Sequence, residues 1–104
     1  MIIKDSEGNI IPDWIIKKGI DIILHNITFD HFIYLRKAIT KDPETWYASS
    51  HFTWGMYIRN LLRKDCCLDV DLPSGNWDDV YIQVVEAAIR KGNIKLSLNN
   101  FRQA

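Results

Sequence analysis

The three histidines could bind a metal or transfer a proton, because imidazole changes its charge close to neutral pH. His25 and His31 lie on either side of an expected helix break, and His51 belongs to a different helix. Metal sites usually combine at least three converging ligands, and the chain has no H-x-x-x-H or Cys-x-x-Cys spacing. The spacing therefore predicts no metal site and no cofactor.

Nucleophilic catalysis needs a serine or cysteine within hydrogen-bond reach of a base. Ser49 and Ser50 precede His51, but successive residues of a helix point about 100° apart, so this adjacency does not make a productive pair. The chain also has no G-x-S-x-G motif, no phosphate-binding glycine loop and no paired-carboxylate motif. We therefore assign no catalytic residue, and the sequence favours a protein that is not an enzyme.

The two cysteines, Cys66 and Cys67, are neighbours and have no third thiol to pair with. A disulfide between adjacent residues closes a strained ring, so no structural bridge is expected. Free thiols are typical of a reducing compartment, which favours the cytoplasm. The pair either fills space in the core or has a redox role, and the sequence leaves both open.

A helix predicted over residues 50–64 has a core face and a second face beside it. With His51 at 0° and 100° per residue, the core face holds His51, Trp54 and Ile58. A second face, at about 80° to 140°, holds Phe52, Met56, Arg59 and Arg63. Aromatic, Met and Arg side chains are enriched in protein interfaces, so this face is the predicted contact surface. Packing of Phe52 and Met56 on another helix is the alternative.

The run from Ser50 to Asn60, SHFTWGMYIRN, resembles the H-F-x-x-G-M-x-I-R-N signature of a family of small bacterial and phage-borne proteins of unknown function. In that family an acidic-capped helix follows a variable loop, as residues 76–80 do here. The resemblance extends over residues 44–90, and residues 61–64 depart from the family pattern. It implies a shared fold and no particular activity.

Composition places the chain among ordinary globular domains, with 104 residues, 47% hydrophobic and 25% charged. Lys plus Arg and Asp plus Glu are 13 each, so the formal net charge is zero and nucleic acid is not an expected partner. No apolar run has the 18 or so residues of a membrane span, and no signal peptide is evident. We expect one domain, residues 1–104, in the cytoplasm.

Helices are predicted over residues 13–26, from Thr28 or Asp30 to about residue 40, over 50–64, and from Trp77 to a stop at Gly92. The last has the narrowest polar stripe and should be the central element. Apolar pairs around a Gly-Asn turn predict a hairpin over residues 2–11, and alternation over 94–98 predicts a strand. The expected fold is mainly α: a compact four-helix domain with a minor β-sheet formed by the N-terminal hairpin and the C-terminal strand (α+β).

These features favour a small cytoplasmic protein-binding or regulatory protein, such as a phage or mobile-element inhibitor of a host protein, or an immunity-type protein. The expected partner is another protein, with a homo-oligomer left open, and no membrane. The alternative function is a small-ligand-binding or hydrolytic domain centred on His51 and Arg59.

Overall fold

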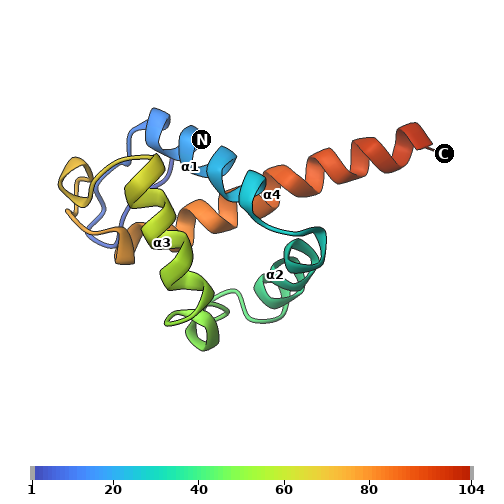
Figure 1. Ribbon diagram of the computed structural model, residues 1–104, viewed down its shortest axis with the longest axis horizontal. Helices are drawn as coiled ribbons and strands as arrows, with labels where there is room; N and C mark the ends of the chain where they lie inside the picture. Colours follow the sequence, from blue (N-terminus) through green and yellow to red (C-terminus); the bar gives the residue numbers. More distant parts are fainter. Residues whose placement is uncertain (1, 104) are drawn as a thin grey trace.

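The computed structural model describes the backbone of residues 2–103 and the side chains of residues 2–92. Its four α-helices are α1 (Asp13–Asn26), α2 (Phe29–Lys41), α3 (Trp54–Asp65) and α4 (Trp77–Gln103). Two short 3-10 helices, Ala48–Ser50 and Asp69–Asp71, precede α3 and α4. In Figure 1, α1 and α3 lie against the first half of α4, α2 lies beside its middle, and its C-terminal end runs on past the other helices. The predicted four-helix, mainly α architecture is confirmed.

The first half of α4 is the centre of the core, as its narrow polar stripe predicts. Its buried side chains are Trp77, Val80, Tyr81, Val84, Val85, Ala87, Ala88 and Ile89. They face α1, α3 and α2, which is why a single helix can be apolar on nearly every side. Each large side chain buried in this way stabilises the fold by about 1.5–3 kcal/mol relative to exposure.

The helices α1 and α3 present isoleucine and leucine to α4 at three- and four-residue spacing. Ile16, Ile20 and Ile23 of α1 are buried, as are Ile58 and Leu62 of α3. The surrounding core also includes the buried side chains of Trp46, Leu35, Phe32 and Ile11. The apolar faces predicted from the helical period are therefore the faces that pack.

The helix α2 begins at one of its two predicted caps, Thr28 and Asp30. Thr28 is the N-cap, and its Oγ1 accepts a hydrogen bond from the backbone N–H of His31 at 3.1 Å. This bond satisfies one of the N–H groups that the first turn of a helix leaves without a partner. Phe32 and Leu35 then point into the core, toward α4.

The predicted β-sheet is wrong. Near the N-terminus a single antiparallel bridge joins Lys4 to Ile10, and a tight turn passes through Gly8 at a φ of 84°. The Oδ1 of Asp5 accepts hydrogen bonds from the N–H groups of Glu7 and Asn9, both at 2.9 Å, which closes the turn locally. The N-terminal segment is therefore a turn, and no β-strand is present among residues 2–103.

The predicted C-terminal strand is also wrong, because residues 94–98 belong to α4. The spacing of Ile94, Leu96 and Leu98 fits a strand, but Gly92 does not end the helix as predicted, so the i to i−4 bonding continues through it. Gly92 lacks the positive φ of a helix stop. A Cβ there would lie 2.4 Å from Cε2 of Phe32, so the glycine lets α2 approach α4 closely.

Gly92→Ala should lower the free energy of unfolding. Alanine gains about 1 kcal/mol of helix propensity, but overpacking against the buried Phe32 ring costs about 1–3 kcal/mol. We expect a net loss of about 1 kcal/mol in urea denaturation. In a Phe32→Leu background the colliding ring atoms are gone, and Gly92→Ala should stabilise instead. A stabilising effect of Gly92→Ala alone would contradict this close packing.

Candidate functional site

The segment before α3 places His51 outside the helix that was predicted to begin at residue 50. Residues 48–50 form a 3-10 helix, in which the N–H of Ser50 donates to the carbonyl of Tyr47 at 3.1 Å. A turn follows, with Thr53 as the N-cap, and α3 begins at Trp54. His51 therefore lies in a turn whose backbone bonds are local, and its direction is set by side-chain contacts.

Those contacts centre on Arg59, which is only 4% exposed. Its Nη1 lies 2.9 Å from Nδ1 of His51, and its Cζ lies 4.9 Å from the ring centre of Tyr81, a cation–π distance. Its Nε lies 2.8 Å from Oδ1 of Asp78, but the N–H is not aligned with that oxygen, so the contact is an ion pair and not a hydrogen bond. The cluster of Arg59, His51, Tyr81 and Asp78 joins the 51–53 turn, α3 and α4.

The ring of His51 contacts two side chains of the cluster. A guanidinium has only donors, and Nη1 of Arg59 is closer to Nδ1 of His51 (2.9 Å) than to Nε2 (3.3 Å). Nδ1 of His51 also lies 2.8 Å from the Tyr81 hydroxyl. One ring nitrogen is thus within hydrogen-bond distance of both Arg59 and Tyr81, and these two contacts hold the imidazole in place.

Tyr81 is held in a dry environment. Burial raises the pKa of its hydroxyl, although the nearby charge of Arg59 works in the opposite direction. A Cβ added to Gly55 would lie 3.0 Å from the Tyr81 oxygen and 3.1 Å from the carbonyl of Ser50. The glycine of the signature therefore makes room for the Tyr81 hydroxyl to reach His51.

A second, more exposed ion-pair group lies beside this cluster. Nε of Arg63 lies 2.7 Å from Oδ1 of Asp69, and Nη2 of Arg63 lies 3.2 Å from Oδ1 of Asp78. Partial burial works to raise the pKa of Asp69, but the Arg63 bond and the backbone N–H of Trp77 outweigh it and lower that pKa. Asp69 therefore stays charged and ties the loop before α4 to α3.

The predicted contact face of α3 is divided in the structure. Phe52 and Met56 are 77% and 42% exposed, whereas Arg59 is buried and Arg63 is 31% exposed and ion-paired. The placement of Arg59 at an exposed face was wrong, because its guanidinium turns inward to Asp78, His51 and Tyr81. Tyr57, which was not singled out, is 52% exposed.

Sequence reasoning also missed Asp78 and Tyr81 as partners of the signature residues. A signal was present: residues 65–89 contain six acidic residues and no basic one. Such a stretch needs cations from elsewhere, and the nearest candidates along the chain are Arg59 and Arg63. The spacing alone, however, could not show which carboxylate reaches which guanidinium.

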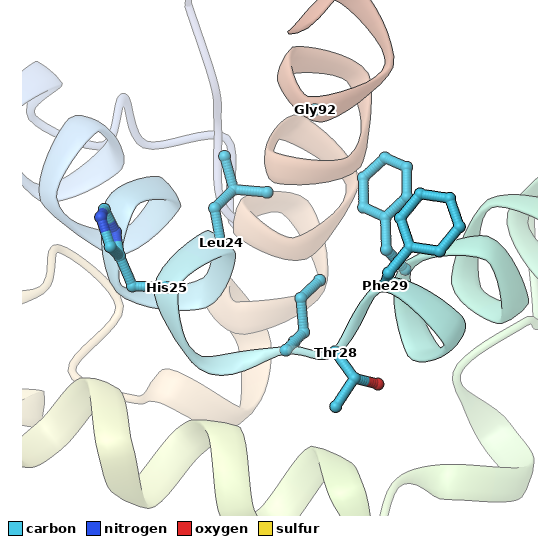
Figure 2. Close-up of a pocket in the computed structure, with 7 residues that line it drawn as sticks. Leu24, His25, Thr28, Phe29 and Gly92 are labelled. Atoms are coloured by element: carbon cyan, nitrogen blue, oxygen red, sulfur yellow. The ribbon is translucent and has the colours of Figure 1, made fainter. Parts of the chain in front are cut away.

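Several shallow hollows surround the helices. One, of about 480 Å³, is lined by His51 and Tyr47 with the acidic residues Glu44, Asp78, Asp79 and Glu86. Arg59 does not line it. A different, mostly apolar hollow of about 290 Å³ lies where α1, α2 and α4 meet, and Figure 2 shows Leu24 and Phe29 reaching into it from α1 and α2 near Gly92 of α4.

The two cysteines lie in the core, and both are reduced. Sγ of Cys66 donates to the carbonyl of Ile15 at 3.6 Å. Burial, with a further contribution from Cys67, raises the pKa of Cys66 to about 12, and burial also raises the pKa of Cys67. Thiols of this kind are chemically quiet.

Within the described residues, no group of three or more His, Cys, Asp or Glu side chains is placed to hold a metal ion. Among the same residues, no helix combines the length and apolar character needed to cross a membrane. Comparison with protein-family models, curated proteins and solved structures finds no match to this chain. The resemblance of residues 50–60 to a family signature stays a prediction.

Arg59→Met should lower the free energy of unfolding by about 1–3 kcal/mol, because it keeps the apolar stem but leaves His51 and Asp78 without their donor. The loss stays below that of a fully buried pair because water can reach Asp78, which is 47% exposed. Urea denaturation measures the change, and the ring nitrogen chemical shifts of His51 should move, because the ring loses its contact with the guanidinium. Arg63→Met is the matched control, with an expected loss below about 1 kcal/mol. Equal losses in both variants would contradict a special role for Arg59.

The thiol of Cys66 should react slowly in the folded protein. Raising its pKa from 9.0 to about 12 reduces the thiolate at pH 8 by about a thousandfold, and burial also blocks the reagent. In a Cys67→Ser variant, labelling by a chromogenic disulfide should be at least about tenfold slower in buffer than in guanidinium, because the loss of thiolate outweighs the higher nucleophilicity of a more basic thiolate. Equal rates in the two conditions would show that Cys66 is accessible.

Proposed function

We propose that this protein is a small protein-binding module that contacts another protein through the outward side of the start of α3. The observation that carries the proposal is the exposure of Phe52, Met56 and Tyr57 within six consecutive residues, which we call the α3 contact face. Aromatic and Met side chains are enriched in the cores of protein interfaces, and Tyr is among the residues enriched where most of the binding energy is concentrated.

Rigidity at this position supports the proposal. The buried contacts of Arg59 with His51, and of His51 with Tyr81, hold the turn that carries Phe52. The ring of Phe52 also lies edge-on to that of His51, with ring centres 4.9 Å apart. A contact surface that is already ordered loses less conformational entropy on binding, which increases affinity.

The role of Arg59 in this proposal differs from the one first predicted. Its guanidinium does not reach a partner but fixes the turn from beneath, and Arg63 is engaged by Asp69 and Asp78. The expected partner therefore presents an apolar surface and not a carboxylate for these arginines. In its regulatory role, the protein would bind its partner in the cytoplasm, either as a phage or mobile-element inhibitor of a host protein or as an immunity-type protein.

The alternative, a ligand-binding or hydrolytic site centred on His51 and Arg59, has less support. The two side chains do converge, but on each other: Arg59 is buried, and Nδ1 of His51 lies within hydrogen-bond distance of Arg59 and of Tyr81. His51 borders the acidic hollow of about 480 Å³, where a substrate would have to enter without contacting Arg59.

Phe52→Ala combined with Met56→Ala should weaken partner binding at least tenfold, because hot-spot truncations each cost about 1–2 kcal/mol or more. Quantitative affinity capture from the native cell should show a protein that the wild type retains and this variant loses. The free energy of unfolding should change by less than about 0.5 kcal/mol, because both side chains are on the surface.

Leu68→Ala combined with Val70→Ala is the matched control, since these side chains are 62% and 82% exposed on the loop before α4. The control should retain the captured protein. Capture that survives loss of Phe52 and Met56, or that depends equally on Leu68 and Val70, would contradict the α3 contact face, as would the absence of any captured protein.

A further inference from the structure

The outer face of α2 carries three cations. Arg36, Lys37 and Lys41, with Thr40, line a shallow hollow of about 440 Å³. The next hollow, of about 290 Å³, is lined by Arg36 together with Arg90 of α4. Among the described residues, none of these four cations has a carboxylate within ion-pair distance. They are therefore available to an outside group.

Carboxylates gather on the adjoining part of the same surface. Glu44, Asp79 and Glu86 line the hollow of about 480 Å³ beside Asp78. Glu44 and Asp79 are exposed, and neither has a cation within ion-pair distance in the described part of the chain. Glu86 is half-buried, and its Oε1 accepts a hydrogen bond from Nε1 of Trp46 at 2.9 Å.

The two groups lie side by side on one continuous surface. Pro43 and Glu86 line both the acidic hollow and the hollow that contains Arg36 and Arg90. Arg36 and Thr40, in turn, line both that hollow and the basic one on α2. We call this the bipolar surface: its basic half is Arg36, Lys37, Lys41 and Arg90, and its acidic half is Glu44, Asp79 and Glu86.

A partner of a single charge sign does not fit this surface. A polyanion attracted by Lys37 and Lys41 would be repelled by Glu44 and Asp79, and like charges placed opposite each other strongly suppress association. The best complement has both signs in the reverse order. A second copy of the chain, turned by a two-fold axis near the boundary at Pro43 and Glu86, presents that reverse order.

We propose that the protein self-associates as a symmetric dimer through the bipolar surface, with the basic half of each copy facing the acidic half of the other. In such an isologous interface every contact occurs twice, so two modest charge contacts become four. Exposed ion pairs are individually weak and are screened by salt, so the dimer is expected to be salt-sensitive.

Sedimentation velocity of the wild type provides the first test. A concentration-dependent dimer is expected at an ionic strength of about 0.01 M, where charges act over about 30 Å, and a monomer at about 1 M, where the range is about 3 Å. A monomer at low salt up to millimolar protein would overturn the proposal, as would a dimer that salt does not affect.

Matched charge reversals provide the second test, using only exposed residues. K37E/K41E leaves the basic half without net charge, because Arg36 and Arg90 remain, and E44K/D79K makes the acidic half net positive, with Glu86 remaining. Each variant alone should be monomeric at low salt. Mixed in equal amounts, the two variants should form a heterodimer, because the unchanged acidic half of one faces the unchanged basic half of the other, and the two altered halves barely repel each other. Recovery on mixing shows that the single variants are folded and have lost only self-complementarity.

K17E/K18E controls for net charge, because it changes the charge as much as K37E/K41E does but lies on the exposed side of α1. It should dimerise like the wild type. Mixed with E44K/D79K, it should bind at least about tenfold more weakly than K37E/K41E does, since its intact basic half would face the half that E44K/D79K has made positive. Equal affinities in the two mixtures would overturn the proposal in favour of general attraction.

Phe52 and Met56 line none of the hollows that make up the bipolar surface. The charge variants should therefore leave partner capture by the α3 contact face intact, and Phe52→Ala with Met56→Ala should leave the dimer intact. Failure of one proposal is in this way distinguishable from failure of the other.

Discussion

A permanent positive charge in the interior is the constraint around which the start of α3 is organised. A guanidinium stays protonated at any physiological pH, so burying Arg59 requires an anion and hydrogen-bond acceptors close by. Asp78 supplies the charge, His51 supplies the acceptor, and Tyr81 supplies an aromatic face. Because these partners come from α4 and from the turn before α3, satisfying one side chain also orders a segment that has little regular secondary structure of its own. The exposed position of Phe52 follows, since its neighbour His51 is turned inward.

The apolar core also depends on a single element, the helix α4. α4 is packed on by α1, α2 and α3, and two of the closest approaches are made where a glycine removes a Cβ: Gly19 next to Val84, and Gly92 next to Phe32. Trp46 connects the long segment between α2 and α3 to the same helix, through its bond to Glu86. The polar cluster and the apolar core therefore share α4 as their common support, and a change that moves this helix would be felt in both.

The helices and their buried faces could be predicted from the sequence, because periodic isoleucine and leucine dominate the energetics wherever a face is buried. The sequence also predicted Thr28, with Asp30 as the alternative, as the cap of α2, because a short polar side chain can accept a backbone N–H at a helix start. The sheet could not be rejected locally: an alternating run such as 94–98 fits either structure, and a glycine at position 92 is typical both of a helix end and of a close helix contact. Arg59 shows the other limit. Its burial depends on Asp78, a residue 19 positions away whose approach is set by tertiary packing.

The order of the elements along the chain has a consequence for synthesis. The helix that covers every other helix is the last of the four, so ribosome-bound chains expose the isoleucines of α1 and the leucines of α3 before their cover exists. Local turns, isolated helices and the contacts of α1 with α3 can form earlier, but every contact with α4 must wait until residues 77–89 have left the exit tunnel. We expect chaperones to bind mainly to nascent chains shorter than this. Folding is then completed only after α4 has been translated, and not one helix at a time.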